Sequence, residues 1–209
     1  MDRKFLIIIA AVILGFVGLV AYQKNSAKPA ADVVRSNNVT GKLDSKVTLT
    51  EFVDFQCEAC AAYYPILESV KEVYKDKVKF QVKYFPLGGG HQYSRLTANY
   101  AEAAARQGKF FEMQQKLFEN QKLWETSNTE QYMQQYAKDI GLDMDKLAVD
   151  LKDSAVNDTI NADLEEVRAL GANGTPTFVL NGKKIDNPDN TAEAFAKILD
   201  EALEGAQRQ

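Results

Sequence analysis

Cysteine and histidine are scarce in this sequence of 209 residues, which contains two cysteines, Cys57 and Cys60, and one histidine, His91. A four-ligand zinc site draws mainly on these residue types and needs more of them than the chain offers. The sequence therefore argues against a zinc site and predicts no bound metal. A lone pair of cysteines also occurs in cytosolic proteins, so the count alone does not assign a redox compartment.

An excess of basic residues is also missing. Lys and Arg total 25 against 29 Asp and Glu, which gives a net charge of −4 and a pI of about 5.2. A nucleic-acid partner would call for a basic patch, and none is apparent, so we expect no nucleic-acid partner. The length is sufficient for one domain with a substantial core.

The N-terminus carries a long apolar run. Arg3 and Lys4 precede residues 5–22, which are uncharged, and as a helix these would span about 27 Å, close to the roughly 30 Å of a hydrocarbon core. We interpret residues 1–24 as a single-pass anchor in the cell membrane, followed by a flexible linker over residues 25–36. A signal peptide cleaved near residues 27–31 is the alternative.

The two cysteines lie where a strand pattern changes to a helix pattern. Residues 47–55 are rich in β-branched and aromatic side chains, and apolar residues follow Cys60 at helical spacing. Two residues between cysteines bring the sulfurs together across the first turn of a helix. The free N–H groups and partial positive charge there stabilise a thiolate, most of all at Cys57, so the pattern indicates a redox dithiol.

The remaining patterns predict an α/β domain over residues 37–205. A half-buried strand over residues 78–84 completes a right-handed βαβ unit with the first strand and its helix. Over about residues 92–171, apolar residues recur at helical spacing in segments that end at glycines. We interpret this region as an inserted all-helical subdomain. A hairpin over residues 177–185 and a last helix from Thr191 close the domain.

Several motifs in this order resemble the DsbA-like thiol-disulfide oxidoreductases, a family with a thioredoxin fold and a helical insertion. The resemblance covers nearly everything from about Val39 to the C-terminus. The similar segments are residues 50–60, 84–87, 101–104, 107–113 and 174–178.

The resemblance implies a role for five residues. Cys57 would be the exposed nucleophile and Cys60 the buried resolving cysteine, with their disulfide as the only redox centre and no other cofactor. Pro176 would be a cis-proline facing the dithiol, and Thr175 would offer its backbone to an extended substrate. Glu51 would be a buried acid that passes protons to or from Cys60, although an acid reaching solvent at the strand end is the alternative.

The residues between the cysteines depart from the strongest oxidases of the family, which have a histidine beside the second cysteine. Here the dipeptide is Glu58-Ala59, and a carboxylate at Glu58 opposes a thiolate at Cys57. We therefore expect a moderate oxidant. For Asp54 and His91 the default expectation is a solvated side chain.

These features predict an extracytoplasmic oxidase that introduces disulfides into exported proteins with reduced cysteines. A membrane redox partner would re-oxidise it, and we expect a monomer; the absence of a dimerisation segment disfavours an isomerase. A reductase or isomerase using the same dithiol is the alternative. A tethered binding or chaperone module with a structural disulfide is a weaker one, because a four-residue disulfide loop stabilises little.

Overall fold

The computed structural model describes residues 9, 12–18, 34–126 and 128–208. The chain divides into two units, Met1–Val33 and Val34–Gln209, which are considered separately. In the first unit, residues 9 and 12–18 are helical, and most of the predicted anchor lies outside the described residues. In the part of the chain that is described, no helix combines the length and apolar character needed to cross a bilayer.

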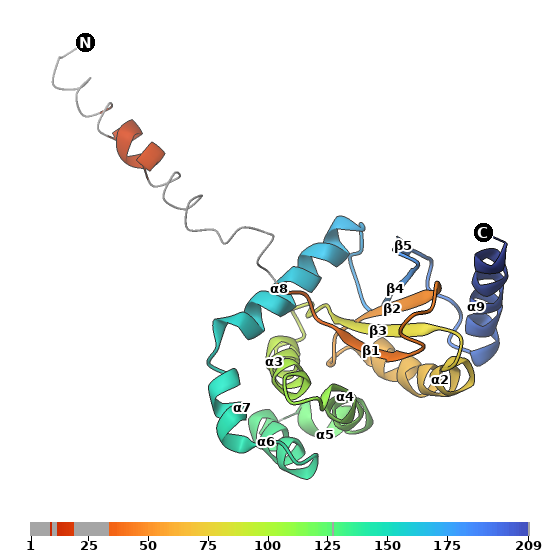
Figure 1. Cartoon of the computed structure of the whole chain (residues 1–209). Helices are drawn as coiled ribbons and strands as arrows, with labels where there is room; N and C mark the ends of the chain where they lie inside the picture. The colour runs from red at the N-terminus through yellow and green to blue at the C-terminus, as the bar shows by residue number, and fades with distance from the viewer. Residues whose placement is uncertain (1–8, 10–11, 19–33, 127, 209) are drawn as a thin grey trace. The chain divides into compact units, whose positions relative to one another are not determined.

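The second unit is built on a five-stranded sheet with the order β1-β3-β2-β4-β5 (Figure 1). The central strand β2 runs parallel to β3 and antiparallel to β4, and β1 and β5 close the edges in antiparallel pairs. The strands are β1 (Asn38–Gly41), β2 (Thr48–Val53), β3 (Lys79–Tyr84), β4 (Thr177–Leu180) and β5 (Lys183–Lys184).

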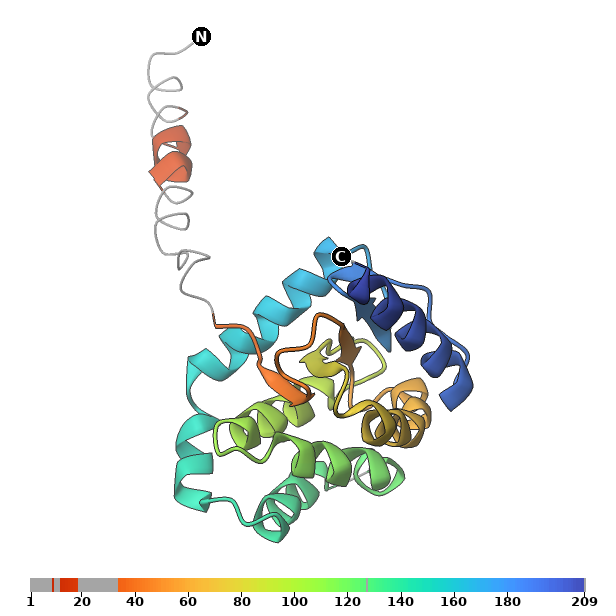
Figure 2. The same ribbon diagram turned by 45° about the vertical axis from the view of Figure 1, so that its right-hand side comes forward.

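Helices cover both faces of the sheet, and the central strand β2 is therefore buried on both sides. On one face, α2 (Glu58–Tyr74) and α9 (Ala192–Gln207) lie side by side (Figure 2) and enclose an apolar cluster that includes Phe178. On the other face, the C-terminal end of α8 packs Val167 against Phe52. The connection through α2 from β2 to the parallel strand β3 is the predicted βαβ unit.

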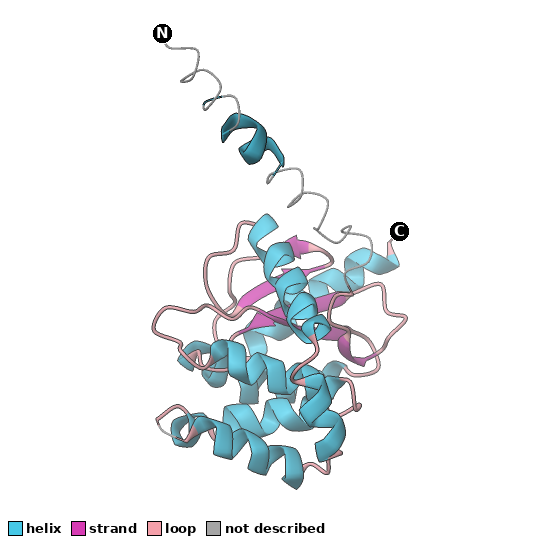
Figure 3. Ribbon diagram, turned by 90° about the vertical axis from the view of Figure 1, so that its left-hand side faces the viewer, coloured by secondary structure: helices cyan, strands magenta, loops and turns pink. Residues whose placement is uncertain are grey.

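In the described residues between β3 and β4 there are six helices. Most of the helices lie beside the strands (Figure 3). Their apolar sides pack around Trp124, which is fully buried, and the short α7 is capped by Asp143, whose carboxylate accepts a hydrogen bond from the Lys146 N–H. The domain is therefore a thioredoxin-like α/β fold with a helical insertion. The helices are α3 (Ser94–Ala105), α4 (Phe110–Glu119), α5 (Gln121–Trp124), α6 (Thr129–Asp139), α7 (Met144–Asp150) and α8 (Ser154–Ala169).

Arg35 and Ser36, assigned to the linker by the sequence, contact α8. Ser36 is buried, and both its N–H and its hydroxyl donate to the Asp163 carboxylate, while Arg35 pairs with Glu166 at 3.1 Å. The ordered domain therefore begins before residue 37. The polar sequence gave no sign of this because the partner acid is 127 residues away along the chain.

We expect Phe195→Ala to lower the free energy of unfolding by about 3–5 kcal/mol, because Phe195 is fully buried and its ring centroid lies 5.2 Å from that of Phe178. Val73→Ala, on the exposed side of α2, should change it by less than about 0.5 kcal/mol. Urea denaturation of both variants measures the difference. A Phe195 variant as stable as the Val73 variant would contradict the packing of α9 on the sheet.

Candidate active site

The dithiol lies at the junction between β2 and α2. Cys57 is the N-cap residue of α2, with extended backbone angles, and its N–H donates to the Asp54 carbonyl oxygen at 3.0 Å. Cys60 lies one turn further into the helix and has no exposed surface, while 8% of Cys57 is exposed. The first cysteine is thus the one that a second thiol would reach.

The surroundings of Cys57 favour its thiolate. A hydrogen bond from the Cys60 thiol is the largest of several effects that together lower the Cys57 pKa to about 5, despite the opposing effect of burial. The backbone N–H groups of Ala59 and Cys60 and the side chain of Thr175 lower it further. The buried Thr175 hydroxyl makes no hydrogen bond to any described residue.

Cys60 has the opposite character. Burial raises its pKa well above the usual range, and the hydrogen bond that it gives to Cys57 and the charge of Glu51 raise it further. The pair therefore consists of one thiolate at the helix start and one thiol in the core, which is the arrangement that thiol-disulfide exchange requires.

The loop before β4 faces the dithiol. The Thr175-Pro176 peptide bond is cis, the isomer that the resemblance implied, and the Thr175 carbonyl oxygen lies 3.4 Å from the Cys57 sulfur. Two hydrogen bonds hold this loop: the Asn187 amide donates to the Pro176 carbonyl at 2.9 Å, and the Thr177 hydroxyl donates to the Gly174 carbonyl at 2.7 Å.

Glu51 lies on β2 opposite Val82 of β3 and Phe178 of β4, on the face that α2 covers. Only 6% of it is exposed, so the alternative of an acid reaching solvent is wrong. Burial raises its pKa to about 7, although Lys71 acts in the opposite direction. A carboxyl with this pKa exchanges protons readily near neutral pH.

The expectation of a solvated Asp54 is also wrong, because the loop after β3 folds over it. Asp54 is 2% exposed, and one carboxylate oxygen accepts hydrogen bonds from the Leu87 N–H at 3.0 Å and the Ser94 hydroxyl at 2.6 Å. The other oxygen accepts from the Gln56 N–H at 2.8 Å. This carboxylate fixes the segment that leads into Cys57.

His91 is partly enclosed by the same contacts, which corrects the expectation of a solvated loop side chain. Its Nδ1 lies 2.9 Å from the Asp54 carboxylate, and 30% of the side chain is exposed. In its charged form it lowers the pKa of Glu58, so the only histidine of the sequence stands within electrostatic reach of the active-site helix.

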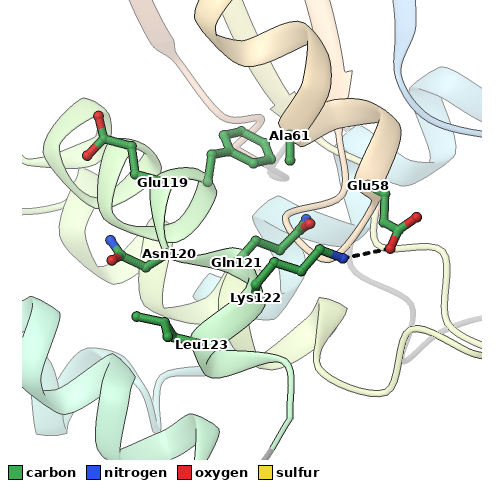
Figure 4. A pocket seen from close by; sticks show the side chains of 8 residues that line it. Glu58, Ala61, Glu119, Asn120, Gln121, Lys122 and Leu123 are labelled. Carbon is green, nitrogen blue, oxygen red and sulfur yellow. Dashed lines mark hydrogen bonds and ion pairs between the residues drawn. The ribbon is translucent and has the colours of Figure 1, made fainter.

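The Glu58 carboxylate is paired, which the sequence did not reveal. Lys122 of α5 reaches it with an Nζ–Oε1 distance of 2.7 Å (Figure 4), and this lysine is the main cause of a lowered Glu58 pKa. Both side chains are largely exposed, so the pair is screened by solvent. The repulsion expected between Glu58 and the Cys57 thiolate is nevertheless partly offset by a nearby cation. Ala59, beside it, is exposed and contributes its backbone N–H.

No sequence pattern indicated a role for Gln121. Its side chain extends from α5 toward the start of α2 (Figure 4), and its amide donates to the carbonyls of Phe55 at 2.8 Å and Cys57 at 3.1 Å. Only 3% of Gln121 is exposed. The contact joins residues 64 positions apart, so no local pattern could have indicated it.

Among the residues that the structure describes, no group of three or more His, Cys, Asp or Glu side chains is arranged to hold a metal ion. The two sulfurs and the neighbouring carboxyl of Glu51 are the groups that can take part in thiol-disulfide exchange at this site.

Comparison with known proteins assigns the fold to a family. A sequence model of the thioredoxin family matches residues 34–201. The chain belongs to the thioredoxin family. The region that matches the family includes the dithiol, the cis-proline loop and the described helices of the insertion.

Several solved structures have folds similar to that of this chain. BdbD from Bacillus subtilis, in its oxidised form, has a TM-score of 0.69 at 24% identity, covering 79% of this chain and 92% of that chain. The thiol-disulfide exchange protein α-DsbA2 from Wolbachia pipientis has a TM-score of 0.66 at 23% identity, covering 79% and 86%. The catalytic domain of Proteus mirabilis ScsC has a TM-score of 0.67 at 24% identity, covering 84% and 93%. At these identities the likeness establishes the fold.

Curated relatives are much longer proteins. Na(+)/H(+) antiporter NhaA 1 of Mycobacterium sp. (strain KMS) is 32% identical over 164 residues, which are 78% of this chain and 26% of the antiporter. Na(+)/H(+) antiporter NhaA of Herminiimonas arsenicoxydans is 28% identical over 173 residues, 83% of this chain and 27% of the antiporter. The chain thus spans about a quarter of the length of these relatives.

We expect the alkylation rate of Cys57 in the reduced protein to follow a titration with a midpoint near pH 5 and to be flat between about pH 6.5 and 8. Iodoacetamide labelling followed by mass spectrometry measures this profile. In Cys60→Ala the midpoint should rise, because the largest cause of the lowered pKa is removed. A wild-type midpoint near that of a free thiol, about 8.5, would contradict the proposed stabilisation.

We also expect Glu51→Gln to stabilise the reduced protein at high pH. Because the Glu51 pKa is raised from 4.5 to about 7, its contribution to stability is complete below pH 4.5 and is lost as the pH rises through about 7. The variant should match wild type at pH 4 and exceed it by up to about 3 kcal/mol at pH 8.5 in urea unfolding. Glu72→Gln, exposed on α2, is the control and should show no such difference. Equal stability of Glu51→Gln and wild type at pH 8.5 would contradict the raised pKa.

Proposed function

We propose that this protein is a thiol-disulfide oxidoreductase that introduces disulfide bonds into exported proteins. The observation that supports this most directly is the contrast between the two sulfurs. Cys57, at the start of α2, has a pKa lowered to about 5, whereas Cys60 is a buried thiol of raised pKa. A structural disulfide would need neither property.

In the proposed reaction the oxidised protein has a Cys57–Cys60 disulfide. A client thiolate attacks the Cys57 sulfur, a mixed disulfide forms, and Cys60 leaves as a thiolate. The client's second thiolate then attacks its own sulfur in the mixed disulfide and releases Cys57 as a thiolate. The client loses two electrons and the dithiol gains them.

The proton balance of this reaction involves Glu51. Cys60 leaves as a thiolate in a buried site where the charged form is unfavourable, so it must take up a proton. The carboxyl of Glu51, with a pKa of about 7, supplies that proton and recovers one from solvent at neutral pH. The Thr175 backbone pairs with the extended client segment, a contact that tolerates many sequences.

The lowered Cys57 pKa supports the proposed direction of electron flow. A thiolate that is stabilised in the reduced protein makes the disulfide easier to reduce, so the protein acts as an oxidant. The exposed Glu58 carboxylate weakens this preference, and Lys122 restores part of it. A moderate oxidant results, with a potential between those of thioredoxin and the strongest oxidases.

For the location, we propose a single-pass membrane protein with its catalytic domain on the extracytoplasmic side. The apolar run over residues 5–22, flanked by Arg3 and Lys4, supports a membrane tether. A separate membrane redox partner would re-oxidise the reduced dithiol after each cycle, and the protein would act as a monomer. The same dithiol working as a reductase or isomerase is the competing function.

The test is to express Cys60→Ala in cells, identify what is trapped on Cys57 by mass spectrometry, and record the redox state of wild type. A predominantly oxidised wild type with reduced exported proteins on the trap supports the oxidase. A predominantly reduced wild type would favour the reductase or isomerase, and an empty trap would favour a binding module. The Cys57→Ala variant, which lacks the nucleophile, is the matched control and should trap nothing.

A further inference from the structure

A groove runs from the active site along α2, between that helix and α4 and α5. It consists of two adjoining hollows of about 360 and 530 Å³, which share Ala61, Phe118 and Glu119 in their linings. The first begins at Glu58, directly after Cys57, and is the hollow drawn in Figure 4. The second extends to Glu68. We call the two together the α2–α4 groove.

The second hollow combines aromatic rings with carboxylates. The rings of Tyr64 and Phe118 lie with centroids 5.1 Å apart and planes at 34°, and both line the hollow. Burial and the charges of Glu68 and Glu119 raise the pKa of Tyr64, so both carboxylates lie near its ring.

The charge of the α2–α4 groove is negative. Three acids line it, Glu58, Glu68 and Glu119, against one lysine, Lys122, which pairs with Glu58. Glu68 pairs with Lys71, which lies outside the lining, at 2.7 Å. Glu119 accepts a hydrogen bond from the neutral Gln115 amide at 2.8 Å, and no ion pair of Glu119 is present in the described part of the chain.

We infer that the α2–α4 groove binds a basic side chain, arginine above lysine, that lies near the reactive cysteine of a client segment. The inference rests on the proposed function, because it takes the client cysteine to be joined to Cys57. A guanidinium group stacks on aromatic faces and pairs with carboxylates, which matches Tyr64, Phe118 and the unpaired Glu119. An ammonium group fits the same charges but stacks less well.

The distance along α2 sets the spacing in the client. From Cys57 to Tyr64 and Glu68 the helix rises about 10–16 Å. An extended peptide advances about 3.3 Å per residue, so the basic residue should lie about three to five positions from the client cysteine. This is a selectivity that strand pairing at Thr175 alone would not produce.

The test uses single-cysteine peptides with the oxidised full-length protein. The peptides are identical except for Arg, Gln, Leu or Glu at the fourth position before or after the cysteine. Quenched mixing and mass spectrometry give the rate of mixed-disulfide formation. We expect the Arg peptide to react about five- to tenfold faster than the Gln peptide on one side of the cysteine, and the Glu peptide to react more slowly.

Glu119→Gln should remove the difference between the Arg and Gln peptides. Glu72→Gln makes the same change of charge on the exposed side of α2, outside the groove, and should retain the difference. Equal rates for the Arg and Gln peptides would overturn the inference and leave the proposed function standing, as would a difference that survives in Glu119→Gln. A Leu peptide that reacts fastest would also overturn it, in favour of an apolar segment. If no peptide reacts, both the proposed function and the inference fail.

Discussion

The active site depends on the hydrogen bond from the Cys60 thiol to the Cys57 sulfur. Two thiolates so close together would repel each other, and one of them would be fully buried, so the pair settles with a single charge. The junction of β2 and α2 decides which sulfur carries it. Cys57 meets the free N–H groups at the helix start, whereas Cys60 is enclosed by the core. The first cysteine along the chain is therefore the thiolate, and the second is the thiol.

The helical insertion takes part in building this site. Gln121 of α5 binds the carbonyl of the nucleophile itself, and Lys122 of the same short helix pairs with the residue that follows it. From the other side, the Asp54 carboxylate joins the segment before Cys57 to the start of α3 through Ser94. A change in how the insertion packs would therefore alter the position of the Cys57 segment, because two separate sets of hydrogen bonds join the two.

Local sequence patterns were sufficient to predict most of the helices and strands and their order along the chain. Alternation and helical spacing predicted the βαβ unit and the order of the elements, and the position of Cys57 at a helix start suggested the nucleophile without any structure. The long-range contacts were not predictable. Gln121 and Ser36 lie in polar stretches and Asp54 lies between Val53 and Phe55, and their partners are 64, 127 and 40 positions away. Such pairings follow from how the elements pack, which a single sequence does not state.

Burial acts to raise the pKa of Cys57, Cys60 and Glu51, but only Cys60 and Glu51 end with a raised pKa. It raises the pKa of Cys60 and of Glu51, and this makes one a poor thiolate and the other a proton carrier near neutral pH. The same burial would also suppress the charge on Cys57, but there the hydrogen bonds of Cys60 and the helix N–H groups outweigh it. The reactivity of the site thus arises from where hydrogen-bond donors are present in a largely buried environment, and for Cys57 the Cys60 thiol and the N–H groups at the start of α2 are such donors.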